Sequence, residues 1–188
     1  LFQLEDGRLI ISDGNKPFLV SKDNGATWEE EKYPWLSKLE EADSYIVDIA
    51  IGADFTTALV IGRMEGDEYI QEGLVIRADG TEIPMEMPSA DTYPRAVGVS
   101  DEGRVFVGMN GDNIYEVKED GSCELYLTVP NGTPSFIQIR DGLLMIDGTS
   151  YETILFYDIE KEEYAEKDEA LNGFIKEYYN GGNKFGSD

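Results

Sequence analysis

The sequence predicts an all-β protein in which a unit of four short antiparallel strands occurs four times. Short apolar runs that favour strands alternate with Asp-Gly and Asn-Gly turns, and little of the chain has helical periodicity. The turn glycines also recur at regular spacing. Gly7 and Gly25 are 18 residues apart, as are Gly103 and Gly121, and Gly80 precedes Gly121 by 41 residues. A period of about 40 residues with four strands is typical of the blades of a β-propeller, which bury their faces by stacking radially.

Each strand position has its own pattern in the four predicted blades, which span residues 1–34, 45–88, 95–129 and 134–167. First strands run into a tight turn, as in LFQLEDG and AVGVSDEG, and buried second strands follow, as in GRLIIS and GRVFVG. Third strands end in another turn, as in PFLVSKDNG and NIYEVKEDG. Fourth strands complete the unit, as in TEIPMEM and SCELYLTV.

Three segments depart from this unit. RMEGDEYIQEG lengthens the connection between the second and third strands of the second blade. PWLSKLEEAD predicts a short helix between the first two blades, because Pro34 suits the first turn of a helix. Residues 174–188 are expected to begin a further blade or to supply a closing strand. Together these features predict a segment of a larger propeller of about six to eight blades.

Charge limits the possible partners and chemistry. Asp and Glu total 39 against 15 Lys and Arg, which gives a net charge of −24, and there is no histidine. Because such an acidic surface repels phosphate backbones, nucleic acid is not an expected partner. The lack of histidine excludes Ser-His-Asp triads and His-ligated metals from this segment, and we predict no catalytic residue, metal or cofactor. No apolar run approaches the roughly 20 residues that cross a bilayer, so no membrane span is predicted.

The segment SKDNGATW of the first blade combines turn-forming residues with an aromatic residue at fixed spacing. Asp23 can accept hydrogen bonds from backbone N–H groups of a tight turn, and Gly25 supplies a positive φ. The hydroxyl groups of Ser21 and Thr27 can satisfy further turn groups. Trp28 is expected to bury its ring beneath the hairpin. The segment therefore predicts a structural turn between a third and a fourth strand.

These five residues match the Asp-box motif, Ser-x-Asp-x-Gly-x-Thr-Trp, and the segment resembles the repeats of bacterial neuraminidases. The resemblance implies a β-propeller fold, a structural box on the rim away from the active face, and an extracellular or cell-surface location. The equivalent turns at Asp79-Gly80 and Asp120-Gly121 lack the Ser and the Trp, and they look like degenerate boxes.

Several functions fit such a propeller. The leading hypothesis is a non-catalytic binding or scaffold module for a glycan or a protein. The alternative is part of a sialidase-like glycoside hydrolase whose catalytic residues lie outside this segment. A sialidase needs an Arg-Ile-Pro motif and an arginine cluster, but the motif is absent and only Arg63 and Arg95 are expected at the rim opposite the box. An assembly factor that docks proteins on the propeller disc is a third possibility.

A candidate binding surface is expected on the face opposite the Asp-box turn. The connectors KYPWL and TYPRA carry Tyr33, Trp35, Tyr93 and Arg95, and Arg63 ends a second strand at the same face. Exposed aromatic rings beside arginines suit sugar or peptide recognition, with the arginines binding a carboxylate or hydroxyl groups. In the other interpretation, the Tyr-Pro pairs only pack and rigidify the connectors.

Overall fold

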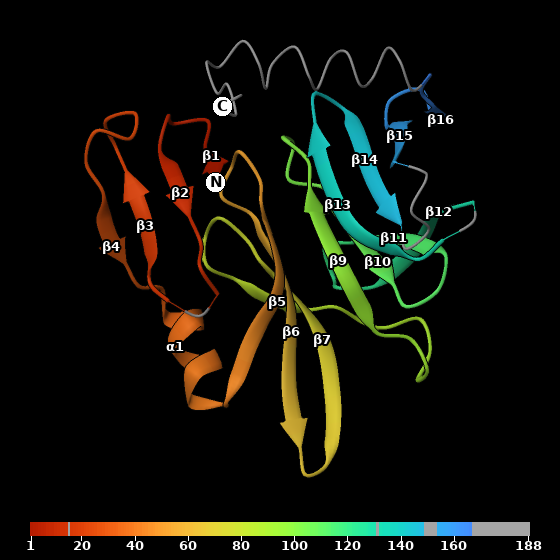
Figure 1. Ribbon diagram of the computed structural model, residues 1–188, viewed down its shortest axis with the longest axis horizontal. Coiled ribbons are helices and arrows are strands. Elements are labelled where there is room, and N and C mark those ends of the chain that lie inside the picture. Colours follow the sequence, from red (N-terminus) through yellow and green to blue (C-terminus); the bar gives the residue numbers. More distant parts are fainter. Residues whose placement is uncertain (15, 131, 149–153, 167–188) are drawn as a thin grey trace, which may run out of the picture.

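Four antiparallel sheets of four strands make up the computed structural model of the chain, which describes residues 1–14, 16–130, 132–148 and 154–166 (Figure 1). Blade 1 comprises β1 (Phe2–Gln3), β2 (Leu9–Ile11), β3 (Phe18–Ser21) and β4 (Glu29–Glu31). Blade 2 comprises β5 (Ser44–Ile51), β6 (Thr57–Glu65), β7 (Glu68–Ile76) and β8 (Glu82–Pro84). Blade 3 comprises β9 (Pro94–Val99), β10 (Val105–Met109), β11 (Asn113–Val117) and β12 (Cys123–Thr128). Blade 4 comprises β13 (Pro134–Arg140), β14 (Leu143–Gly148), β15 (Ile154–Asp158) and β16 (Glu163–Tyr164).

The predicted fold, an all-β propeller arrangement of four blades with four antiparallel strands each, is confirmed. The insertion in blade 2 extends β6 and β7 to nine residues each, and this hairpin projects from the body of the molecule (Figure 1). Helix α1 (Pro34–Glu41) connects blades 1 and 2 and has proline in its first turn, as expected. No helix in the described residues has the length and apolar character of a membrane span. The segment 174–188 lies outside the described residues.

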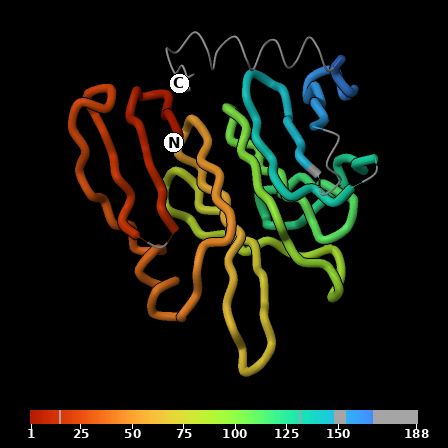
Figure 2. The backbone as a smooth tube through the Cα atoms, in the orientation of Figure 1, coloured from red at the N-terminus to blue at the C-terminus, as the bar shows by residue number. Residues whose placement is uncertain are grey.

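The blades follow one another in chain order, as the colours of Figure 2 show. A hydrophobic core lies between the two blades of each neighbouring pair. The core between blades 1 and 2 includes Ile10, Phe18, Leu59 and Ile61, and helix α1 adds Trp35, Leu36 and Leu39. The core between blades 2 and 3 includes Val60, Val75, Val97 and Val107, and the one between blades 3 and 4 includes Phe106, Ile114, Leu144 and Ile146. Each blade thus stabilises its neighbour by covering its apolar face.

Two glycines of blade 3 allow blade 4 to approach closely. A Cβ atom on Gly98 would lie 2.6 Å from Cγ2 of Ile137, and one on Gly108 would lie 2.8 Å from Cγ of Pro134. Both distances are too short for carbon atoms in contact, since the optimum is about 3.5–4.0 Å. The sheet-to-sheet distance at this interface therefore depends on the absence of these side chains.

One turn geometry recurs along one edge of the propeller. In residues 100–104, the N–H of Ser100 donates to the carbonyl of Arg104 (2.9 Å), and the N–H of Gly103 donates to the carbonyl of Ser100 (3.0 Å). The same pair of bonds closes residues 4–8, 52–56, 77–81 and 118–122. The fourth residue has a positive φ, which glycine adopts without strain. This geometry explains the regular spacing of Asp-Gly turns in the sequence.

We call this edge the turn rim; it also carries residues 22–28. We call the opposite edge the connector face; it is formed by the connectors 32–43 and 85–93 and by the loops 65–68 and 110–112. The two edges follow from the antiparallel order, which places alternate chain reversals at opposite ends of each blade.

The five residues of SKDNGATW that match the motif all take part in one turn. Oγ of Ser21 accepts from the N–H of Gly25 (2.8 Å) and donates to Asp23 (2.9 Å). The carboxylate of Asp23 accepts from the N–H (2.8 Å) and the hydroxyl (2.6 Å) of Thr27. Nε1 of Trp28 donates to the carbonyl of Gly25 (3.1 Å). The expected turn contacts of Asp23 are present, but Trp28 is only half-buried. Its ring lies beside Gly25 of the turn, where a Cβ would be 3.6 Å from Cζ2 of Trp28.

We expect Gly98→Ala to lower the free energy of unfolding by about 1–3 kcal/mol, the usual cost of overpacking a core. The reason is that the new methyl group would meet the β-branched Ile137, which has little rotamer freedom. Gly111→Ala is the matched control, because a Cβ there meets no atom within 4 Å. Urea denaturation measures both variants. Equal stabilities of the two would contradict the close packing of blades 3 and 4.

We also expect the stabilising effect of Asp23 to depend on pH. Hydrogen bonds from the hydroxyl and N–H of Thr27, and then from Ser21, hold the pKa of Asp23 below its ordinary value. A lowered pKa gives stability that is present above the unfolded-state pKa, about 3.9, and is lost as the pH falls through the folded-state pKa. Asp23→Asn should therefore lower the melting temperature at pH 7, and the difference from wild type should shrink below about pH 4. A difference that stays constant with pH would contradict this account.

Candidate functional site

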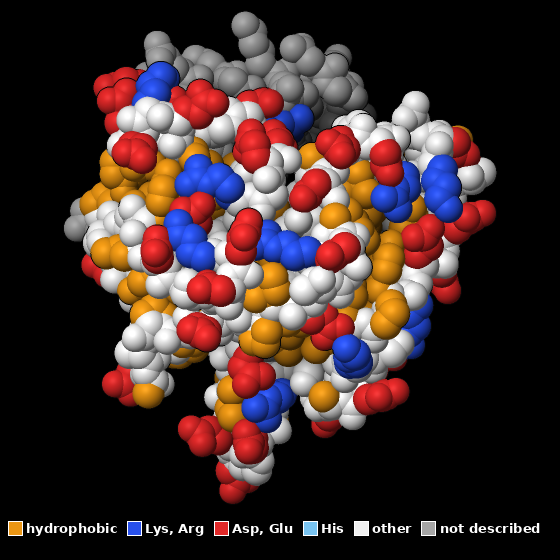
Figure 3. All heavy atoms as spheres, turned by 180° about the vertical axis from the view of Figure 1, so that it is seen from behind, with side chains coloured by type: hydrophobic (Ala, Val, Ile, Leu, Met, Phe, Trp, Pro, Cys, Tyr) orange, Lys and Arg blue, Asp and Glu red, His pale blue; other side chains and the backbone are white. Residues whose placement is uncertain are grey.

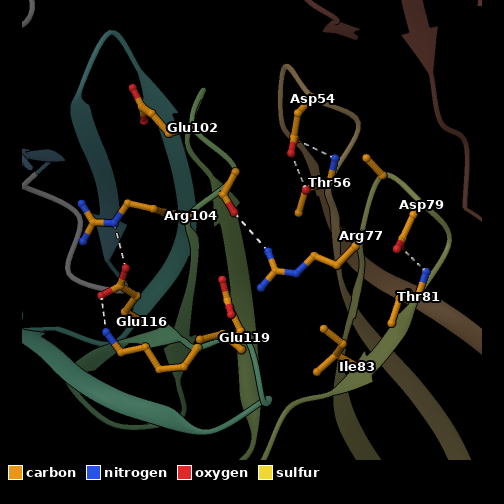
Figure 4. A pocket seen from close by; sticks show the side chains of 14 residues that line it. Asp54, Thr56, Arg77, Asp79, Thr81, Ile83, Glu102, Arg104, Glu116 and Glu119 are labelled. Carbon is orange, nitrogen blue, oxygen red and sulfur yellow. Dashed lines mark hydrogen bonds and ion pairs between the residues drawn. The ribbon is translucent and has the colours of Figure 1, made fainter.

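A cleft of about 740 Å³ lies between blades 2 and 3 at the turn rim (Figure 4). Its cationic side chains already bind acidic side chains or the backbone. Nη1 of Arg77 donates across the cleft to the carbonyl of Gly103 (3.2 Å), and Nε of Arg104 donates to Glu116 (2.7 Å). Glu116 also binds Lys118 (2.7 Å). Because the cations of this cleft are paired, its contacts link two blades and offer little to a ligand.

A second cleft, about 520 Å³, lies between the same two blades on the connector face. One wall consists of residues 68–71 of the projecting β6–β7 hairpin and of Val47 in β5. The other wall is the connector 90–93 together with Arg95 at the start of β9. The space-filling view shows a notch between the projecting hairpin at the bottom and the neighbouring loop (Figure 3). The volume is in the range of small-molecule and peptide side-chain pockets, about 300–1,000 Å³.

Tyr69 lines the hairpin wall, and Tyr45 of β5 stacks on it from outside the cleft. The rings of Tyr45 and Tyr69 lie 6.2 Å apart at 14°, and Tyr69 is 46% exposed. Tyr69 reaches Tyr45 across Gly62, where a Cβ would lie only 2.6 Å from the Tyr69 hydroxyl. Burial, followed by a hydrogen bond with Tyr45, raises the pKa of Tyr69 to about 12. Gly62 thus permits an aromatic platform on the hairpin surface.

The connector wall is fixed by Asn110, from the loop after β10. Its Oδ1 accepts from the N–H of Tyr93 (3.2 Å), and its Nδ2 donates to the carbonyl of Asp91 (3.1 Å). The backbone N–H of Asn110 also donates to the carbonyl of Tyr93 (3.1 Å). These three bonds hold the Tyr93 segment in place while its ring remains 39% exposed.

Arg95 is the cation of this cleft, and its side chain is exposed. Within the described residues it makes no hydrogen bond or ion pair, although the chain has 39 acidic residues. Every other described Lys or Arg has an interaction partner: Arg8, Lys16, Lys22, Lys32, Lys38, Arg63, Arg77, Arg104, Lys118, Arg140 and Lys161. A guanidinium without a protein partner remains available to an anionic group of a ligand.

The five residues expected on one binding surface are divided between two interfaces. Tyr93 and Arg95 lie together in the connector-face cleft. Arg63 follows Gly62 in β6, so it points to the opposite face of blade 2, where it binds Glu65 and Glu72.

The two aromatic residues of the first connector belong to the core between blades 1 and 2. Trp35 is 5% exposed and packs edge-on against Phe18, and the half-buried Tyr33 stacks on Trp35 at 6.1 Å. Trp35 is therefore not an exposed contact residue. Helix α1 is the reason, because its apolar side turns Trp35 inward together with Leu36 and Leu39.

The sequence alone did not single out Tyr45, Tyr69 or Asn110. Their contacts depend on how the β6–β7 hairpin lies against β5 and how the loop after β10 lies against the connector 90–93. No group of His, Cys, Asp or Glu in the described ranges is arranged to hold a metal ion.

No protein-family model matches this sequence, and no curated protein matches it. Solved structures share its fold. The selenomethionine-substituted virginiamycin B lyase from Staphylococcus aureus is similar with a TM-score of 0.53 and 15% identity, over 87% of this chain and 67% of that protein. A streptogramin B lyase is similar with a TM-score of 0.52 and 16% identity, over 87% of this chain and 51% of the lyase. The chain thus spans about half the length of the latter protein, and at these identities the likeness concerns the β-propeller fold alone.

We expect Gly62→Ala to disrupt the tyrosine platform. The new methyl group would displace the hydroxyl end of Tyr69 from Tyr45, and the pKa of Tyr69 should fall from about 12 toward the ordinary tyrosine value. NMR of Cζ-labelled tyrosine, with Tyr69→Phe for assignment, reports the ionisation. In the wild type Tyr69 should still be mostly neutral near pH 11, about one unit above the ordinary tyrosine pKa. If Tyr69 ionised at the same pH in both proteins, the stacking across Gly62 would be wrong.

Proposed function

We propose that the chain is a non-catalytic binding or scaffold module that receives a glycan or protein ligand in the connector-face cleft between blades 2 and 3. The observation that supports this most directly is Arg95, an exposed cation with no partner among the described residues in a chain of net charge −24. Glu68 and Asp91 line the same cleft, yet neither forms an ion pair with Arg95 in the part of the chain that the structure describes. Its position beside Tyr93 and Tyr69 favours a ligand with a carboxylate and an apolar surface.

We assign the segment SKDNGATW to the Asp-box class, since all five residues of the motif act together in one turn. This assignment favours a secreted or cell-surface protein. It also favours a larger propeller of about six to eight blades. The apolar side chains Leu19 of blade 1 and Phe136 of blade 4 are exposed, as is expected of faces that further blades would cover.

The sialidase-like alternative has less support from the geometry. A carboxylate clamp needs several arginines around one point, whereas Arg63 and Arg95 lie on opposite sides of blade 2. Arg63 is also occupied by two glutamates. A binding module needs only Arg95, which is unpaired within the described residues, and the aromatic side chains of the cleft.

Arg95→Gln tests the proposal. Hydrogen bonds to charged groups contribute about 1.5–3 kcal/mol, so this variant should weaken binding of the ligand at least about tenfold. Ligands would be sought on an array of acidic and neutral oligosaccharides and in a library of linear peptides, with affinities measured by calorimetry. Arg63→Gln, on the other face of the blade, is the matched control and should bind like wild type. A ligand whose affinity is unchanged by Arg95→Gln but lost in Arg63→Gln would refute the location of the site.

A further inference from the structure

The β6–β7 hairpin has a free edge. The two strands pair along their full length, from Thr57 with Ile76 to Glu65 with Glu68. On its other side, β7 pairs with β8 only at residues 74–76, and the chain then leaves toward blade 3, where the N–H of Glu86 donates to the carbonyl of Gly121. In the described part of the chain, residues 68–72 of β7 therefore have no neighbouring strand on their outer side.

The backbone groups exposed on this edge can be assigned from the register. The carbonyl of Gly73 accepts from the N–H of Met85 (2.9 Å), so the backbone groups of Gly73 point outward. Because successive residues of a strand direct these groups to alternate sides, Gln71 and Tyr69 also point outward. No bond within the described residues satisfies the backbone N–H or C=O of Gln71 or Tyr69 on that side.

This free edge is one wall of the connector-face cleft. Four consecutive residues, 68–71, line the cleft. Since consecutive side chains point to opposite faces of a sheet, a cleft that touches all four runs along the edge of the strand. Arg95 lies on the facing wall, and Val47, Tyr69 and Tyr93 expose 41%, 46% and 39% of their surfaces around it.

We propose that an extended peptide segment of a partner protein binds here by adding a strand to the edge of β7 and placing a carboxylate on Arg95. The proposal rests on the binding function proposed above and specifies its ligand as a peptide. Backbone bonds to Tyr69 and Gln71 hold the segment, as in other cases of strand addition. The apolar side chains of the cleft take one of its alternate side chains, and Arg95 selects for an acidic residue.

Charge argues against a second copy of the same chain as the occupant. If the edges of two copies paired antiparallel about Ile70, Glu68 of each copy would lie opposite Glu72 of the other. Like charges directly opposite destabilise a strand pair, and charged residues on an edge are a common protection against self-association. The edge is thus protected against its own copy. Arg95 on the facing wall has no ion-pair partner among the described residues and can bind one carboxylate of a peptide, although Glu68 and Asp91 also line the cleft.

Gln71→Pro is the direct test, because proline removes an outward N–H and leaves the inner hydrogen bonds to β6 intact. Gln71→Ala is the matched control, since it removes the side chain and keeps the N–H. The probe is a 12-residue peptide selected from a random library displayed on phage against the complete chain, and binding is measured by calorimetry. We expect Gln71→Pro to weaken binding at least about tenfold and Gln71→Ala to change it by less than about threefold. Equal affinities of the two variants would overturn strand addition.

Amide hydrogen exchange of the wild type gives a second measurement that does not depend on a variant folding. Saturation with the peptide should slow exchange at Tyr69 and Gln71, because strand addition would bond one or both of these amides. Unchanged exchange at both positions would overturn the proposal even if the peptide bound elsewhere.

Two further outcomes separate this proposal from the proposed function. An acidic oligosaccharide that binds in dependence on Arg95 but equally well to Gln71→Pro would overturn the peptide ligand and leave the binding module standing. A probe that is insensitive to both Arg95→Gln and Gln71→Pro would overturn both. A wild type that sediments as a dimer without peptide, and as a monomer after Gln71→Pro, would make a second copy the occupant and also overturn the proposal.

Discussion

Face-to-face packing of neighbouring blades is the interaction on which the other features of this structure depend. A sheet of four strands exposes two apolar faces, and one sheet cannot cover both of them. In this chain each neighbouring pair of blades encloses its own core. Close packing requires that some side chains be absent, as at Gly98 and Gly108 opposite blade 4. The result is a rigid array whose loops and turns are left at two edges.

The two edges are organised differently. On the turn rim, the same hydrogen-bonded turn recurs, and aspartates such as Asp54 and Asp79 accept bonds from the threonine two residues later. Polar groups there are mostly satisfied by the turn itself or by the adjacent blade, as Arg77 is by Gly103. On the connector face, the loops differ in length between blades. Arg95 and part of the edge of the long blade 2 hairpin have no partners there among the described residues. The more regular edge stabilises the array, and the irregular edge is the one available for binding.

The sequence predicted the blade pattern well because glycine marks turn positions with positive φ. Phe55 is an exception to this rule, because it has φ 74° at the position that glycine takes in the equivalent turns. A non-glycine residue in this conformation persists only where its surroundings hold it, and Phe55 packs against Tyr33 at 5.3 Å and beneath Arg8 at 5.6 Å. Its turn could not be recognised from composition, because the compensating contacts come from another blade.

The candidate binding surface was harder to predict, because its contacts also come from more than one blade. Sequence position correctly placed Tyr93 and Arg95 together, since a connector and a first strand meet at one edge. It could not tell that Arg63 points away from them, because one residue of register decides the face and a bulge between Ile46 and Asp48 shifts the pairing of β5 with β6. It also could not tell a buried Trp35 from an exposed one, because that depends on the rotation of α1 against blade 1.

Other strand edges of this protein are hydrogen-bonded to neighbouring protein groups, and this distinguishes them from the free edge of β7. At the inner strand β9, the N–H of Val97 is bonded by the carboxylate of Asp48 from the neighbouring blade (2.9 Å). Burial raises the pKa of Asp48, so this contact places an acidic group where its charged form is disfavoured. At the outer side of blade 2, the segment after β8 is bonded to blade 3 through Glu86. These two edges are closed by protein groups, one of them at an electrostatic cost. Within the described ranges, the outward groups of Tyr69 and Gln71 have no such partner, and they lie at the cleft that also holds Tyr93 and Arg95. Water can satisfy them in the free protein, so the edge is stable without a ligand, and a peptide strand can replace that water without any rearrangement of the blades.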